Sequence, residues 1–176
     1  QFLEDVTAPA LALDGTRTGT HKLHQEPSLV QSTGAIEELF DTIDYSKGGA
    51  IIRMVATTLD LIEPGLWARS IEQYLHDHTY GNALAKDLWQ AIATCSQEPA
   101  WPARLDTWSN QEGYPLLTVS SQEGVTQKRF FNNYQRDSSD ATKWWVPISY
   151  CVFSKPTPTN NGVLQLNADA LACFAR

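Results

Sequence analysis

Apolar side chains recur at helical spacing through the first two-thirds of the chain. Residues three or four positions apart lie on one face of an α-helix, so this spacing predicts amphipathic helices. Four such stripes follow one another: Ile51, Val55 and Leu59; Trp67, Ile71, Tyr74 and His78; Leu84, Leu88, Ile92 and Cys95; and Trp101, Leu105 and Trp108. We predict that each stripe faces the core, and that the side chain of Asn82 caps the third helix.

The pattern changes after Gly113. Short runs rich in β-branched and aromatic residues replace the helical stripes, and turn-forming residues separate them. These runs cover residues 116–119, 125–131, 144–153 and 163–166. The sequence therefore predicts an α+β fold, in which an all-α helical part over residues 1–112 precedes strands over residues 113–176 that form one layer or a partial β-sandwich.

Composition and charge exclude several classes of protein. Of the 176 residues, 42% are hydrophobic, which is enough to bury a core, and the net charge is −7. Residues 1–112 hold 16 acidic and 7 basic residues, whereas residues 113–176 hold 4 acidic and 6 basic residues. Nucleic-acid-binding modules concentrate basic residues on one face, so we expect no nucleic-acid partner. No apolar run approaches the roughly 18 residues of a membrane span, so we expect no span in this sequence.

The four histidines form two close pairs, and neither pair predicts a metal site strongly. His76 and His78 are two residues apart, which places them on different faces of a helix, so we expect an exposed His76 and a packed His78. A zinc site built on His21 and His24 remains an alternative. No His-Glu-x-x-His sequence occurs in the 176 residues, so we expect no set of zinc ligands in this segment.

The most informative stretch is residues 40–54, Phe-Asp-Thr-Ile-Asp-Tyr-Ser-Lys-Gly-Gly-Ala-Ile-Ile-Arg-Met. Tyr45 lies just ahead of a predicted helix whose first turn contains Gly48 and Gly49. A tyrosine at a helix entrance either points its hydroxyl into a cleft or packs in the core with that hydroxyl hydrogen-bonded. From the residues alone, the packed role is the favoured interpretation.

This stretch resembles the helix-entrance motif of the M1 family of zinc aminopeptidases (gluzincins), Phe-Asp-x-Ile-x-Tyr-x-Lys-Gly followed by Arg-Met. Further segments resemble the family in the same order. They are Gly65-Leu66, Tyr74-Leu75, His78, Asn82-Ala83, Asp87-Leu88-Trp89, Thr107-Trp108, Gly113-Tyr114-Pro115 and Trp145-Val146-Pro147-Ile148. The resemblance covers essentially the whole chain, and the ordered series is more specific than any single motif.

The resemblance implies a place within a larger enzyme. Tyr45 occupies the position of the family's catalytic tyrosine, whose hydroxyl stabilises the oxyanion, and Phe40 matches a position that lines the pocket for the substrate's first side chain. The chain would be a fragment that covers the rear helical part of a thermolysin-like catalytic domain and the start of the β-sandwich domain. Zinc would be bound by the parent enzyme and not by this segment, and its partners would be a peptide substrate and the rest of the enzyme.

Two alternatives to this interpretation remain open. The first is a non-catalytic, aminopeptidase-like scaffold or fragment used for protein–protein contacts. The second is an independent metal protein that uses His21 and His24. The compartment also remains open, because the resemblance covers both cytosolic and membrane-anchored enzymes; three cysteines without Cys-x-x-Cys spacing favour the cytosol slightly.

Overall fold

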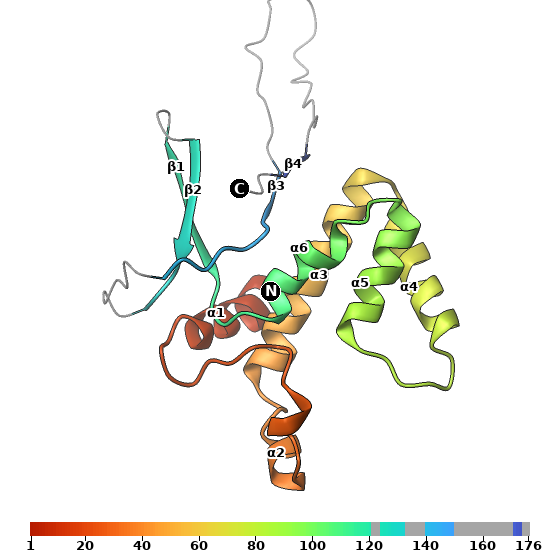
Figure 1. The fold of residues 1–176 in the computed structure, drawn as a ribbon. Coiled ribbons are helices and arrows are strands. Elements are labelled where there is room, and N and C mark those ends of the chain that lie inside the picture. Colours follow the sequence, from red (N-terminus) through yellow and green to blue (C-terminus); the bar gives the residue numbers. More distant parts are fainter. Residues whose placement is uncertain (121–123, 133–139, 150–170, 174–176) are drawn as a thin grey trace, which may run out of the picture.

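The computed structural model describes residues 1–120, 124–132, 140–149 and 171–173. Helical elements come first along the chain and strands follow (Figure 1). The α-helices are α1 (Ala8–Asp14), α2 (Thr33–Glu37), α3 (Gly48–Ile62), α4 (Leu66–Asp77), α5 (Ala85–Ser96) and α6 (Trp101–Ser109). Two π-helical turns, η1 (Leu3–Thr7) and η3 (Ile43–Lys47), precede α1 and α3, and Pro27–Leu29 form the 3-10 turn η2. The α+β class predicted from the sequence is confirmed.

The four predicted helices correspond to α3, α4, α5 and α6. Ile51, Val55 and Leu59 of α3 are buried, as their spacing predicts. On α4 the buried positions are Leu66 and Ser70. Of the predicted stripe, Trp67 packs against the same core, and Ile71, Tyr74 and His78 are partly buried. The α4 and α5 helices lie side by side, and α2 lies apart from the other helices at the lower edge of Figure 1.

The prediction that Asn82 caps the third helix is wrong. That helix, α5, begins at Ala85, so Asn82 lies too far ahead of it. The carboxylate Oδ2 of Asp87 instead accepts the backbone N–H of Leu84 at 2.7 Å. Asp87, in the first turn of the helix, therefore provides the acceptor for an N–H group that the helix itself leaves unpaired. Its negative charge also interacts favourably with the positive end of the helix dipole.

Two short antiparallel pairs make up the described strands. β1 (Pro115–Ser120) pairs with β2 (Gly124–Arg129), and β3 (Pro147–Ser149) pairs with β4 (Leu171–Cys173). The register aligns Pro115 with Arg129 and Ser120 with Gly124 in the first pair. The first two predicted strands are thus confirmed, whereas residues 150–153 and 163–166 of the other two lie outside the described residues.

The strand predicted over residues 144–153 does not begin at Trp144. The segment before β3 is extended, but side chains rather than a neighbouring strand satisfy its backbone groups. Gln127 bonds both the N–H and the carbonyl of Trp144, at 2.8 and 2.9 Å. The hydroxyl of Thr107 accepts the N–H of Trp145 at 3.0 Å. The indole N–H of Trp108 donates to the carbonyl of Trp145 at 2.6 Å, so this segment is bonded to α6 and β2 and has no free backbone groups for a ladder at these positions.

The hydrophobic core crosses the boundary between the helical part and the strands. Trp144 and Trp145 are buried in one cluster with Trp101 and Trp108 of α6. The rings of Trp101 and Trp145 meet edge to face with centroids 5.2 Å apart. Aromatic pairs in this geometry add to the free energy gained by burying their area, so α6 and the segment before β3 stabilise one another.

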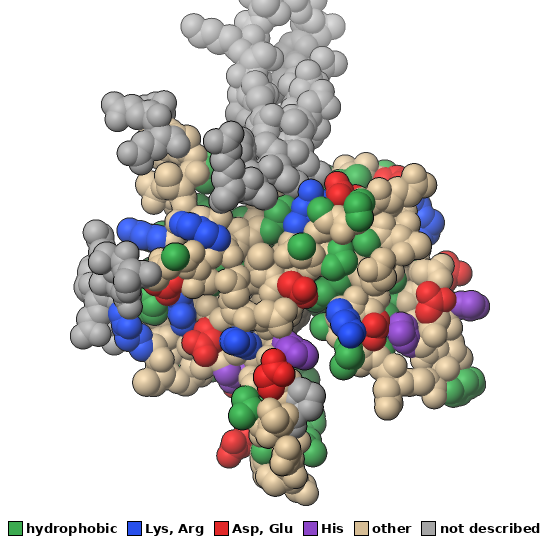
Figure 2. All heavy atoms as spheres, in the orientation of Figure 1, with side chains coloured by type: hydrophobic (Ala, Val, Ile, Leu, Met, Phe, Trp, Pro, Cys, Tyr) green, Lys and Arg blue, Asp and Glu red, His purple; other side chains and the backbone are tan. Residues whose placement is uncertain are grey.

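Charged side chains of both signs are mixed over the face drawn in Figure 2. Among the described residues, the helices are all too short or too polar to cross a lipid bilayer.

Candidate functional site

A π-helical turn carries Tyr45, and we call Ile43–Lys47 the tyrosine turn. It leads without a break into α3, because the backbone N–H of Gly48 donates to the carbonyls of Ile43 and Tyr45. Single π-helical turns within longer helical segments are frequent at functional sites. The prediction that Tyr45 lies just ahead of a helix beginning at Gly48 is confirmed.

Tyr45 and Phe40 both present their rings to the surface of this chain. Tyr45 is 65% exposed and Phe40 is 66% exposed. The two rings are neighbours, with centroids 6.3 Å apart and planes inclined by 34°. Across the parts of the chain that the structure describes, no hydrogen bond occupies the Tyr45 hydroxyl. The packed core role that the residues alone favour for Tyr45 is therefore wrong.

Asp41 holds the start of the tyrosine turn. One carboxylate oxygen, Oδ1, accepts the backbone N–H groups of Ile43 at 2.7 Å and Asp44 at 3.0 Å. The backbone carbonyl of Asp41 accepts the N–H of Tyr45 at 3.1 Å. The first N–H groups of a helix have no partner within it, and Asp41 supplies acceptors to three in succession.

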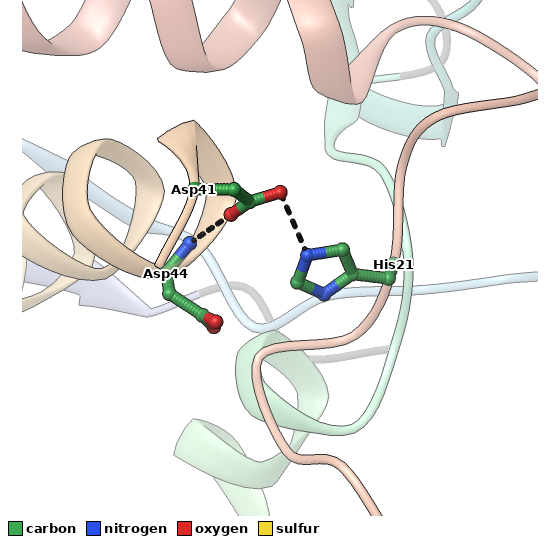
Figure 3. Close-up of side chains that lie close together, drawn as sticks. All are labelled: His21, Asp41 and Asp44. Atoms are coloured by element: carbon green, nitrogen blue, oxygen red, sulfur yellow. Dashed lines mark hydrogen bonds and ion pairs between the residues drawn. The ribbon is translucent and has the colours of Figure 1, made fainter. Parts of the chain in front are cut away.

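His21 contacts the second carboxylate oxygen of Asp41. Its Nε2 lies 2.9 Å from Oδ2 of Asp41 (Figure 3). Its Nδ1 lies 2.8 Å from the carbonyl of Lys22 and 2.8 Å from the amide nitrogen of Gln25. His21 comes from the segment between α1 and η2, whereas Asp41 lies two residues before the tyrosine turn and Asp44 lies within it. Nε2 of His21 therefore donates to a carboxylate, whereas Nδ1 can donate to the carbonyl of Lys22 or accept from the amide of Gln25.

The pKa values of this group follow from its contacts. Burial lowers the pKa of His21, but its hydrogen bonds to Lys22 and Asp41 and the negative charges of Asp41 and Asp44 outweigh burial, so the pKa lies above its ordinary value. Burial raises the pKa of Asp41, yet the backbone N–H of Asp44 and the ring of His21 bring it below its ordinary value. Burial together with the charge of Asp41 raises the pKa of Asp44, against the effect of His21. His21 and Asp41 thus favour the charged state of each other.

His21, Asp41 and Asp44 form the one group of three potential metal ligands in residues 1–120, 124–132, 140–149 and 171–173, with ligand atoms within 4.8 Å of one another. They do not fit a catalytic zinc, which takes at least two His or Cys ligands in most enzymes. A cation here would also have to break the contact between His21 and Asp41. His24 does not join this group, so the alternative of a metal site on His21 and His24 gains no support.

Lys47 holds the other end of the tyrosine turn. Its Nζ lies 2.8 Å from Oδ2 of Asp14 in α1 and donates to the carbonyl of Gly113 at 3.1 Å. The other carboxylate oxygen of Asp14 accepts the backbone N–H of Gly113 at 2.9 Å. Both side chains are buried, and burial lowers the pKa of Lys47 even though Asp14 opposes this. The pair ties the tyrosine turn to α1 and to the connection that leads into β1.

Two cavities lie beside the tyrosine turn. One, of about 590 Å³, is mainly apolar and lies between η1, α1 and α3 on one side and β1 and the segment before β3 on the other; Lys47 and Asp14 are part of its lining. The other, of about 470 Å³, is lined in part by Asp44, Gly48 and Trp89. Neither Tyr45 nor Phe40 is among the residues that line these two cavities.

The second histidine pair behaves as the helical spacing predicts. The side chain of His76 is 84% exposed and lies near Asp77, with Nδ1 and Oδ1 3.2 Å apart. His78 is partly buried and its ring lies 5.4 Å from that of Tyr74. The two rings do not converge on a common site.

Comparison with known proteins decides the family. Residues 1–108 match the Peptidase family M1 domain. This chain belongs to peptidase family M1. The M1 chain is 36% identical over 126 residues to glutamyl aminopeptidase of Rattus norvegicus, which is 69% of the chain and 13% of that protein.

Relatives of the M1 chain occur beyond animals. Aminopeptidase M1 of Arabidopsis thaliana is 32% identical over 154 residues, or 86% of the chain and 16% of that protein. Tricorn protease-interacting factor F2 of Thermoplasma volcanium is 32% identical over 151 residues, or 84% of the chain and 18% of that protein. The chain therefore spans less than a fifth of the length of each of these relatives.

Proposed function

We propose that the M1 chain is part of a zinc-dependent aminopeptidase that removes N-terminal residues from peptides. Residues 1–112 would form the rear helical part of a thermolysin-like catalytic domain, and residues 113–176 the start of a β-sandwich domain. Three observations support this assignment: relatives are named aminopeptidases, the family match ends at residue 108, and the first strand begins at Pro115.

Tyr45 is the catalytic residue that this segment contributes. The observation that carries this role is an exposed phenol with no hydrogen-bond partner in the described part of the chain, on a turn held at one end by Asp41 and at the other by Lys47. During amide hydrolysis the carbonyl oxygen of the scissile bond gains negative charge. A preorganised phenol that donates a hydrogen bond to this oxygen stabilises the charge and lowers the barrier.

Phe40 contributes to substrate binding. Its ring lies beside that of Tyr45 and is exposed at the same surface of the chain. An aromatic ring at this position offers apolar contact area to the first side chain of the peptide, next to the phenol that would contact the reacting carbonyl. Phe40 would therefore affect which N-terminal residue binds best.

The zinc ion of the parent enzyme would be bound outside these 176 residues. The sequence holds no His-Glu-x-x-His, and the His21, Asp41 and Asp44 group does not fit a catalytic zinc. The remaining part of the enzyme is accordingly the main partner of this segment, and it would cover Tyr45 and Phe40 in part and complete the active site around them.

The test is the variant Tyr45→Phe in the full-length enzyme, assayed by hydrolysis of a fluorogenic aminoacyl amide. Loss of one oxyanion donor typically lowers kcat by about 10²–10³. Zinc content should remain that of the wild type. Tyr80→Phe is the matched control, because Tyr80 is fully exposed on the turn after α4. A near-normal kcat for Tyr45→Phe would contradict the proposal and favour the non-catalytic scaffold.

A further inference from the structure

We infer that His21 and Asp41 position Tyr45 for catalysis: His21 fixes the carboxylate of Asp41, and Asp41 fixes the turn that carries the phenol. This inference rests on the proposed catalytic role of Tyr45. Both are positioning residues, since neither is expected to contact the reacting atoms.

Asp41 determines where the tyrosine turn begins. Its carboxylate Oδ1 and its carbonyl oxygen together accept three consecutive backbone N–H groups, the third of which belongs to Tyr45. A change in the orientation of this carboxylate therefore moves the backbone from which the Tyr45 side chain extends. The hydroxyl lies at the far end of that side chain, so a small rotation of the turn becomes a larger displacement of the hydroxyl.

His21 determines how the carboxylate of Asp41 is oriented. It approaches from a segment 20 residues earlier in the chain and contacts Oδ2, the oxygen that the turn itself leaves free (Figure 3). The second ring nitrogen contacts the carbonyl of Lys22 and the amide of Gln25, and these two contacts fix the plane of the ring. Hydrogen bonds from surrounding residues of this kind hold the groups of a functional site in one geometry.

The His21–Asp41 pair contributes little to the stability of the fold. Its side chains are 27% and 31% exposed, and such partly solvated pairs contribute little to the free energy of unfolding. Removing His21 should therefore leave the protein folded, while it frees the carboxylate that holds the turn. An effect on catalysis without an effect on stability separates a positioning role from a merely structural one.

The test uses the full-length enzyme with His21→Gln, Asp41→Asn and the double variant, each with Tyr45 and with Phe at position 45. Asp41→Asn keeps an oxygen for the backbone N–H groups of the turn and removes the acceptor for His21. The matched control is His76→Gln, which breaks an exposed contact between His76 and Asp77 on α4. The readouts are kcat and KM for a fluorogenic aminoacyl amide, the zinc content and the Tm.

The inference predicts that His21→Gln and Asp41→Asn each lower kcat by about 10- to 100-fold, the loss expected when a catalytic group is misplaced by about 1 Å. KM and Tm should change little, and the double variant should be no slower than the slower single variant. With Phe at position 45, His21→Gln should cause no further loss, because the hydroxyl that it positions is already absent.

Two results would overturn the inference alone. One is a wild-type kcat for His21→Gln when Tyr45→Phe has a strongly lowered kcat. The other is an equal fold loss from His21→Gln with Tyr45 and with Phe at position 45, since His21 would then act elsewhere. A near-normal kcat for Tyr45→Phe would overturn the proposed function, and the inference with it.

Discussion

Lys47 and Asp14 form a buried ion pair that joins the tyrosine turn to α1. Nζ and Oδ2 lie 2.8 Å apart, and the two side chains are 6% and 2% exposed. The same two residues bond the backbone of Gly113, at the point where the chain leaves α6 for β1. One pair of charges therefore fixes three segments that are distant in the sequence.

Lys47→Met should destabilise the protein strongly. The substitution leaves the carboxylate of Asp14 buried without its cation, and breaking a buried pair in this way costs about 3–5 kcal/mol. Urea denaturation of the full-length protein measures the loss in free energy of unfolding, from the unfolding transition that involves this segment. Arg69→Met is the matched control: Arg69 and Glu63 are also 2.8 Å apart, but they are 46% and 57% exposed, so the loss should be within about 1 kcal/mol. Equal losses of unfolding free energy in the two variants would contradict the argument that burial makes the Lys47–Asp14 pair the more costly one to break.

His21 should titrate above its ordinary pKa because Asp41 and Asp44 face it. A raised pKa means that the small stabilising contribution of this contact is fully present below the unfolded value of about 6.5 and is lost as pH rises through the folded value. Asp41, whose pKa is lowered, contributes above its unfolded value and loses that contribution as pH falls through the folded value. NMR of labelled histidine side chains measures the shift directly.

Asp41→Asn is the control for this titration. It removes the negative charge that faces Nε2 of His21 and keeps the shape of the side chain. The pKa of His21 should then fall toward its ordinary value. An unchanged pKa would show that the contact at 2.9 Å does not favour the imidazolium.

Gly113→Ala should be destabilising for two reasons. Gly113 has a φ of +81°, a conformation that costs a residue with a Cβ atom about 1–2 kcal/mol. The added Cβ would also lie 2.5 Å from Nε of Arg129, whose side chain is only 14% exposed and lies near Glu112 and Asp140. A lower Tm is the expected result.

The control for Gly113 is Gly34→Ala. Gly34 lies in α2, and a Cβ there would meet nothing within 4 Å. Alanine is the better helix former, so this variant should be neutral or slightly stabilising. A loss of Tm at Gly34 as large as that at Gly113 would refute the argument from conformation and contact.

Phe40→Ala should change substrate preference rather than stability. The ring is 66% exposed in this chain, so its removal creates no core cavity. If it lines the pocket for the first side chain, KM should rise for aminoacyl amides with large apolar side chains and less for small ones. Leu29→Ala is the control, because Leu29 is 69% exposed on the separate turn η2. An identical effect on large and small substrates would exclude the pocket role.

Local spacing predicted the helical part of the fold well. Ile51, Val55 and Leu59 are buried because a four-residue interval keeps them on one face of α3, and tertiary contacts did not override it. The place of Tyr45 ahead of α3 followed from the same local logic. The exposure of Tyr45 could not be predicted in this way. A tyrosine ring is apolar enough to be buried, and only the fold decides which way it points.

The spacing of residues could not predict the parts of the site that depend on contacts between residues distant in the sequence. The contact of Asp41 with His21 joins positions 20 apart, and that of Lys47 with Asp14 joins positions 33 apart. A weak signal for Asp41 did exist, since an aspartate just ahead of a helix commonly caps it. Trp144 was misjudged as a strand residue for the same reason, because its backbone partner is the side chain of Gln127.

The tryptophan cluster limits where this chain can be divided. A protein that ends at residue 112 would expose the face of α6 that carries Trp101 and Trp108, and one that begins at residue 113 would expose Trp144 and Trp145. Either half would expose an aromatic, hydrophobic surface to solvent and tend to aggregate. Gly113 thus marks a change of secondary structure, whereas the core continues past it, from the helices to the segment that precedes β3.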